Sequence, residues 1–119
     1  MIKKVLVVGA SGNSSRYSNK AIIKLCENSH KVFAFGNRPG EVMGIEISTK
    51  FPSHKIDTIT IYLSAKNQKQ YYKEIIALNP IRIIFNPGAE NEELSSLAKK
   101  KSIKVMNACT LVMLSIGNF

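Results

Sequence analysis

Residues 3–18 read Lys3-Lys4-Val5-Leu6-Val7-Val8-Gly9-Ala10-Ser11-Gly12-Asn13-Ser14-Ser15-Arg16-Tyr17-Ser18. The apolar run Val5 to Val8 breaks into small residues and then into a helical pattern, which predicts a strand, a tight loop and a helix. The first N–H groups of a helix have no intrahelical acceptors and carry partial positive charge, so they stabilise an anion such as a diphosphate. The stretch therefore predicts a phosphate-binding turn.

Length and charge limit what this chain can be. With 119 residues and 45% hydrophobic content, it suits one domain over residues 1–119 with a single ligand site. Its 17 Lys and Arg residues against 8 Asp and Glu residues give a formal net charge of +9. This excess favours an anionic partner, either nucleic acid or a small polyanion.

The cysteines and the apolar runs indicate the cellular compartment. Cys26 and Cys109 show no spacing typical of a disulfide framework or a zinc site, and we expect no metal site. The N-terminal apolar run ends near Ala10 without a cleavage pattern, and no apolar stretch is long enough to span a bilayer. We therefore expect a cytoplasmic protein that does not associate with a membrane.

Strand and helix patterns alternate along the chain. Apolar, β-branched segments predict five main strands, at residues 5–8, 31–35, 57–63, 82–85 and 103–106, with a short irregular strand near residues 45–47. Helical patterns lie between them: a stripe of Ala21, Ile22, Leu25 and Cys26, a segment at 66–78, a helix capped by Asn91, and a terminal helix at 109–116.

This alternation predicts right-handed βαβ units and a parallel sheet covered on both faces. We expect an α/β fold, a Rossmann-like three-layer sandwich with a five-stranded parallel sheet. Counting those five strands along the chain, the predicted order is 3-2-1-4-5. Ligands bind such sheets beyond the carboxyl ends of the strands. The candidate ligand loops are therefore residues 9–18, 36–40, 63–67 and 86–90.

The loop after the first strand lacks a dinucleotide-binding fingerprint. The pattern G-x-G-x-x-G would need glycines where Ser11 and Ser14 stand, and an acidic residue at the end of the second strand. That strand is followed instead by Gly36, Asn37 and Arg38. Arginine favours a phosphorylated ribose, which both NADP and CoA carry, over the free diol of NAD.

Three segments together carry a family resemblance. They are Gly9-Ala10-Ser11 with Asn13, Ser14, Arg16, Tyr17 and Ser18; Gly36-Asn37-Arg38-Pro39-Gly40; and Asn86-Pro87-Gly88-Ala89-Glu90. The chain resembles the small bacterial CoA-binding domain proteins, which are single-domain, Rossmann-like and related to the CoA-binding domain of the succinyl-CoA synthetase α subunit. The resemblance covers nearly the whole chain, including the ending Ala108 to Leu114.

The resemblance implies coenzyme A as the ligand and gives each loop a role. Gly9, Ala10 and Ser11 would approach the diphosphate, and Asn13, Arg16, Tyr17 and Ser18 would complete that loop. Asn37, Arg38, Pro39 and Leu63 would flank the adenosine end. Asn86, Pro87 and Gly88 would line the side along which the pantetheine arm runs.

No catalytic residue stands out, because the chain has no recognisable Ser-His-Asp or Cys-His arrangement. The sequence favours a non-catalytic module that binds or senses CoA or an acyl-CoA. The alternative is a small NADP-binding oxidoreductase or redox sensor. Nucleic-acid binding is disfavoured, because the lysines are scattered and have no aromatic stacking platform among them. A homodimer is compatible with so small a domain, although no stretch marks an interface.

Overall fold

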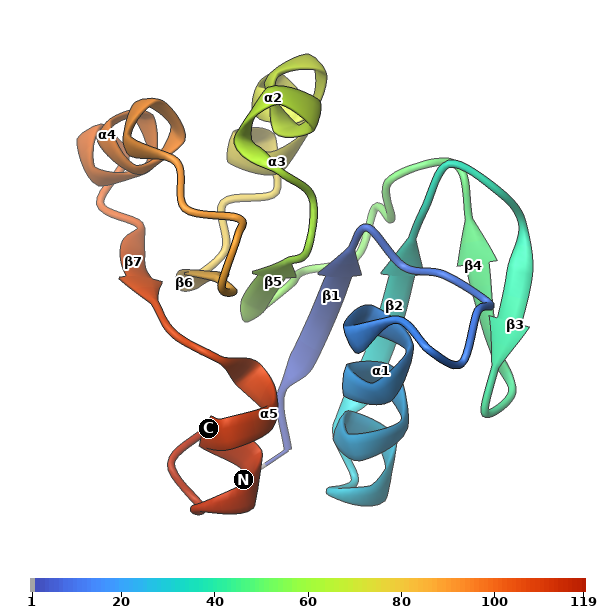
Figure 1. Cartoon of the computed structure of the whole chain (residues 1–119). Coiled ribbons are helices and arrows are strands. Elements are labelled where there is room, and N and C mark those ends of the chain that lie inside the picture. Colours follow the sequence, from blue (N-terminus) through green and yellow to red (C-terminus); the bar gives the residue numbers. More distant parts are fainter. Residues whose placement is uncertain (1) are drawn as a thin grey trace.

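A computed structural model describes residues 2–119 as one mixed sheet with helices on both faces (Figure 1). The strands are β1 (Lys4–Val8), β2 (Lys31–Phe35), β3 (Gly40–Val42), β4 (Ile45–Ser48), β5 (Thr58–Ile61), β6 (Arg82–Phe85) and β7 (Lys104–Asn107). The helices are α1 (Tyr17–Glu27), α2 (Ala65–Gln68), the 3-10 turn η1 (Lys69–Tyr71), α3 (Tyr72–Ala77), α4 (Glu92–Lys100) and α5 (Thr110–Ser115).

The strand order corrects two sequence predictions. Residues 2–119 form seven strands rather than five, in the order β3-β4-β2-β1-β5-β6-β7, and only the β3–β4 pair is antiparallel. The predicted order 3-2-1-4-5 placed segment 57–63 next to the second strand, β2. This segment is β5, and it pairs instead with β1, on the side of β1 away from β2. All four residues of β5 are buried, which suits a central strand rather than an edge strand.

The short strand near residues 45–47 explains the difference in order. It is β4, and it occupies the position beside β2 that the prediction had given to β5. β3 then folds back on β4 through a turn in which Met43 and Gly44 both have positive φ. A three-residue strand gives almost no periodic signal, so β3 was not predicted.

β1 supplies residues to a core on each face of the sheet. Leu6 and Val8 pack into the larger cluster, under α3 and α4, while Val5 and Val7 pack into the cluster under α1 and α5. All four side chains are 0% exposed. Successive residues of a strand point to opposite faces, so a continuous apolar run is what a strand covered on both sides requires.

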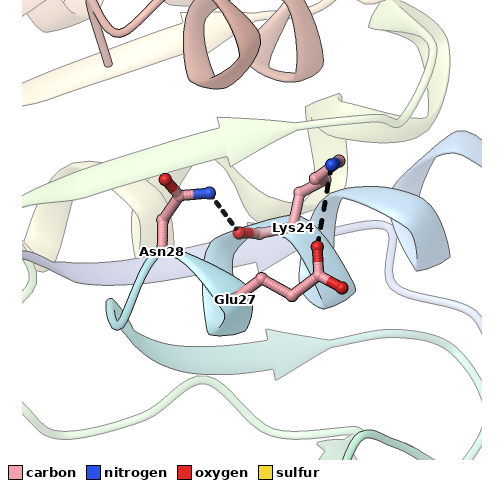
Figure 2. Close-up of polar contacts among 3 residues, drawn as sticks. All are labelled: Lys24, Glu27 and Asn28. Atoms are coloured by element: carbon pink, nitrogen blue, oxygen red, sulfur yellow. Dashed lines mark hydrogen bonds and ion pairs between the residues drawn. The ribbon is translucent and has the colours of Figure 1, made fainter.

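Three residues of the stripe predicted for α1, Ala21, Ile22 and Leu25, are fully buried, whereas the fourth, Cys26, is half-buried. At the end of α1, Asn28 Nδ2 donates to the Lys24 carbonyl oxygen at 2.8 Å, and Lys24 Nζ lies 3.7 Å from Glu27 Oε1 (Figure 2). This ion pair is exposed and contributes little to stability. The buried stripe therefore holds the helix on the sheet.

The other helices follow local signals. Asn91 Oδ1 accepts the Leu94 N–H at 3.0 Å, which confirms the predicted cap of α4. The helix predicted over 66–78 is divided into α2, η1 and α3. Within residues 2–119, no helix combines the length and the apolar character that crossing a membrane requires.

Candidate functional site at the carboxyl edge

The loop after β1 is fastened to the end of β2. The N–H groups of Gly9 and Ala10 both donate to the Phe35 carbonyl oxygen, each at 2.9 Å. Gly9 has φ +92°, and a Cβ atom there would lie 3.2 Å from the Leu63 backbone nitrogen. Gly9 is therefore required by the chain's own packing. Because its N–H group and that of Ala10 are already bonded, neither is free to donate to an anion.

A set of short hydrogen bonds shapes the rest of this loop. Asn13 Oδ1 accepts from the Ser15 N–H at 3.0 Å and from Ser15 Oγ at 2.8 Å. The Asn13 N–H donates to Ser11 Oγ at 3.1 Å, and the buried Asn19 donates its Nδ2 to the Ser11 carbonyl oxygen at 2.9 Å. The Asn13 side chain thus serves the loop itself.

The backbone N–H groups that have no acceptor lie at the tip of the loop after β1 and at the start of α1. Among residues 2–119, none accepts a hydrogen bond from the N–H of Ser11, Gly12 or Ser14. The Arg16 side chain makes no capping bond to α1, so it leaves the first N–H groups of this helix without a side-chain acceptor. Exposed N–H groups at a helix start attract an anion. Arg16 and Tyr17 are exposed beside them, whereas Ser18 is buried.

The loop after β2 lies against the loop after β1. A Cβ atom on Gly36 would collide with the Ala10 carbonyl oxygen, and one on Gly40 would lie 3.9 Å from the Gly12 Cα atom. Figure 1 shows the chain after β1 running across to β3 before it returns to α1. The exposed residues between the two glycines are Asn37, Arg38 and Pro39. Two of the predicted ligand loops are therefore brought together.

Asn86, at the end of β6, is 1% exposed and uses its whole side chain in structural bonds. Its Nδ2 donates to Thr60 Oγ1 at 2.7 Å and to the Ile61 carbonyl oxygen at 2.9 Å, while its Oδ1 accepts the Thr110 N–H at 2.9 Å. Asn86 thus joins β5, β6 and α5. Pro87 and Gly88, which follow it, are exposed.

Gln68 was missed by sequence reasoning and links the loops after β5 and β6. Its side chain is fully buried, and its Nε2 donates to the Leu63 carbonyl oxygen at 2.8 Å and to the Ala89 carbonyl oxygen at 2.7 Å. Its Oε1 accepts from Asn91 Nδ2 at 2.8 Å. A signal was present, because Gln68 lies seven residues before Ile75, on the apolar face of the predicted helix.

Tyr62 follows β5 and has a buried hydroxyl group that bonds to nothing within residues 2–119. The neighbouring hydroxyls of Thr60 and Thr110 bond to each other instead, at 2.8 Å. Burial, and then the nearby Cys109, raise the pKa of Tyr62 to about 12. This phenol stays protonated at neutral pH and is unsuited to proton transfer there.

The candidate residues thus fall into two groups. The open loop tips carry Ser11, Arg16, Tyr17, Asn37, Arg38, Pro39, Pro87 and Gly88, whereas Gly9, Ala10, Asn13, Ser18 and Asn86 are engaged in packing or hydrogen bonding. Leu63 is half-buried against Gly9. Pro87 and Gly88 follow β6, two strands along the sheet from β1.

A mostly parallel sheet, with a loop of unbonded backbone N–H groups at its carboxyl edge, defines a Rossmann-like α/β protein. The chain belongs to the CoA binding domain family, whose model matches residues 3–115, and this confirms the resemblance seen in the sequence. The comparison with curated proteins gave no match.

Solved structures share this fold over most or all of the chain. One is the crystal structure of an uncharacterized protein, which shares 40% sequence identity with this chain and has a TM-score of 0.96. The match covers 100% of this chain and 99% of that one. The cell-free ID.343 protein of Thermus thermophilus is 20% identical, with a TM-score of 0.87, over 99% and 91%. A dinucleotide-forming acetyl-coenzyme A synthetase of Ca. Korarchaeum cryptofilum is 19% identical, with a TM-score of 0.72, over 89% of this chain and 25% of that one.

Proposed function

We propose that the protein binds coenzyme A or an acyl-CoA at the carboxyl edge of the sheet. The observation that carries this proposal is the packing of the loop after β1 against the loop after β2, where Gly12 and Gly40 meet beside exposed N–H groups. Membership of the CoA binding domain family supports the same ligand.

The residues at this edge fit the ligand's charge. The N–H groups of Ser11 and Gly12, together with those of the first turn of α1, would hold the diphosphate. Arg16 and Arg38 are exposed on the two neighbouring loops and would supply positive charge to phosphate groups. Gly9 and Ala10 would act indirectly, by holding the loop against β2.

The apolar and thiol-bearing parts of the ligand would meet other residues. Leu63 follows β5 beside Gly9, and Asn37 and Pro39 are exposed next to Arg38, so these would flank the adenosine end. Pro87 and Gly88 are exposed after β6 and would line the pantetheine side. Asn86 would position that loop through its bonds to Thr60 and Thr110.

A binding or sensing role, rather than catalysis, is the more economical proposal. His30 accepts the Lys3 N–H, at 3.1 Å, next to the start of β1. His54 stacks on Phe33, with ring centroids 4.7 Å apart. Neither contact belongs to the loops that follow β1, β5 and β6. Tyr62 lies at the carboxyl edge, but its pKa of about 12 makes it a poor base at neutral pH.

Isothermal titration of the purified protein with CoA, acetyl-CoA, NADP and NAD tests the proposal. We expect CoA or acetyl-CoA to bind at least about tenfold more tightly than either nicotinamide nucleotide. NADP is the informative competitor, since Arg38 would suit its ribose phosphate as well as that of CoA. A preference for NADP would favour the oxidoreductase or redox-sensor alternative, and the absence of binding to all four compounds would reject the proposal.

A further inference from the structure

Residues of α3 and α4 line an apolar groove. Both helices cover the face of the sheet opposite α1 (Figure 1). The groove has a volume of about 400 Å³, and its floor is made by Ile76, Ala77 and Leu97. Leu97 is 37% exposed although it lies on a helix that packs on the core. Amphipathic helices bind other proteins by laying their apolar face into a groove between helices.

Lysines border this floor. Lys73, Lys100 and Lys101 line the groove, and all three are exposed. Among residues 2–119, the only ion pair within 4 Å joins Lys24 and Glu27, so these three charges lack a carboxylate partner. The chain as a whole carries a net charge of +9. An apolar strip with unneutralised lysines complements a ligand that has apolar and acidic groups side by side.

Tyr72 also lines the groove, and its hydroxyl accepts from Asn91 Nδ2 at 2.9 Å. Lys73 follows Tyr72 on α3, whereas Lys100 and Lys101 lie at the end of α4. Both helices therefore contribute lysines, and a helix lying in the groove would face them with its acidic residues.

We propose that the α3–α4 groove is a docking surface for an acidic amphipathic helix of a partner protein. A second copy of this chain is a poor occupant, because the same three lysines would face each other. Nucleic acid is also disfavoured, because the floor is aliphatic and the half-buried Tyr72 is the single aromatic residue in the lining. The proposal is independent of CoA binding, which involves loops at the carboxyl edge.

The test uses a synthetic helical peptide of about 18 residues, with leucines on one face and glutamates flanking them. Binding to the ¹⁵N-labelled full chain is followed by chemical-shift mapping and by fluorescence anisotropy. We expect saturable shifts confined to α3 and α4. The variant Lys73→Glu/Lys100→Glu/Lys101→Glu should weaken binding at least about tenfold, and Leu97→Ser should weaken it several-fold. Circular dichroism checks that both variants remain folded.

A matched variant separates docking from general charge attraction. Lys31→Glu/Lys50→Glu/Lys55→Glu changes the net charge by the same amount at exposed lysines outside the groove, and it should leave peptide affinity within about twofold. Equal losses in the two triple variants would overturn the proposal. So would shifts spread over all lysine-bearing surfaces. Binding to phosphatidylserine vesicles without binding to the peptide would indicate a membrane surface as the occupant of the groove, and this result would also overturn the proposal.

Discussion

Gly12 and Gly40 lie against one another where the loops after β1 and β2 meet. A Cβ atom on Gly40 would be 3.9 Å from the Gly12 Cα atom, whereas a Cβ atom on Gly12 would meet no atom of residues 2–119 within 4 Å. Gly12 also lacks the positive φ of Gly9. A side chain at Gly12 can therefore enter the proposed phosphate site without disturbing the fold.

The first prediction concerns Gly12→Asp. A carboxylate at this position would lie next to the proposed diphosphate, and two like charges a few ångströms apart near a surface repel by several kcal/mol at most. We expect CoA affinity to fall at least about tenfold, with the free energy of unfolding nearly unchanged. Titration calorimetry and urea denaturation measure the two quantities. Gly12→Asn is the neutral control of similar size. An equally large loss of CoA affinity in Gly12→Asn would show that the size of the new side chain, rather than its charge, weakens binding.

The second prediction compares alanine at two glycines of the same loop. Gly9→Ala should destabilise the protein by about 1–3 kcal/mol, because Gly9 has φ +92° and its new Cβ atom would lie 3.2 Å from Leu63. Gly12→Ala should be neutral or stabilise by up to about 1 kcal/mol. Urea denaturation measures both values. Equal stability of the two variants would contradict the strain assigned to Gly9.

The third prediction concerns Arg38. If this exposed side chain meets the ribose phosphate, Arg38→Ala should weaken CoA binding about tenfold and leave dephospho-CoA binding nearly unchanged. Arg38→Lys keeps the charge but loses the bidentate geometry, so its affinity for CoA should lie between that of the unchanged protein and that of Arg38→Ala. Titration of each variant with both ligands gives the comparison. The assignment fails where Arg38→Ala weakens the two ligands equally.

Much of the fold could be predicted because its main strands and helices carry strong local signals. The apolar run of β1, the stripe of α1 and the Asn91 cap all appear where the sequence predicts them. The strand order was wrong for a physical reason. β4 has only four residues, and only Ala34 and Phe35 of β2 pair with it, so its place in the sheet depends on tertiary contacts.

The candidate site was predictable in outline but not in detail. Loop position follows from the alternation of strands and helices, so the sequence could place Gly9 and Arg38 at one edge. Which groups remain free depends on partners far away in sequence. The N–H group of Gly9 bonds to Phe35, and the Asn86 side chain bonds to Thr60 and Thr110. No local pattern reports such long-range bonds.

The fourth prediction contrasts two buried polar side chains. Asn86→Ala removes three hydrogen bonds and leaves the Thr110 N–H and the Ile61 carbonyl oxygen without this partner, so it should destabilise by about 2–4 kcal/mol. Tyr62→Phe removes a buried hydroxyl that bonds to nothing within residues 2–119, so it should be neutral or stabilising by up to about 1 kcal/mol. Urea denaturation measures both, and a large loss in Tyr62→Phe would reveal a partner for its hydroxyl.

The fifth prediction concerns pH. His30 Nδ1 accepts the Lys3 N–H at 3.1 Å, and the ring packs against Phe119, with centroids 5.1 Å apart. Burial, and then the positive charges of Lys3 and Arg82, lower the pKa of His30 below its usual 6.5. Between the lowered value and about 6.5, the unfolded chain binds more protons at this position than the folded chain. Stability should therefore fall as pH drops below about 6.5.

Urea denaturation between about pH 7.5 and pH 5.5 measures this effect, above the range where most carboxylates titrate. His30→Asn places an amide oxygen near the acceptor position and removes the titrating group, so it should flatten the pH dependence. His54→Asn is the matched control, because the exposed His54 stacks on Phe33 and has no such bond to Lys3. A pH dependence of stability that survives in His30→Asn and disappears in His54→Asn would contradict the prediction, because it would assign the effect to His54.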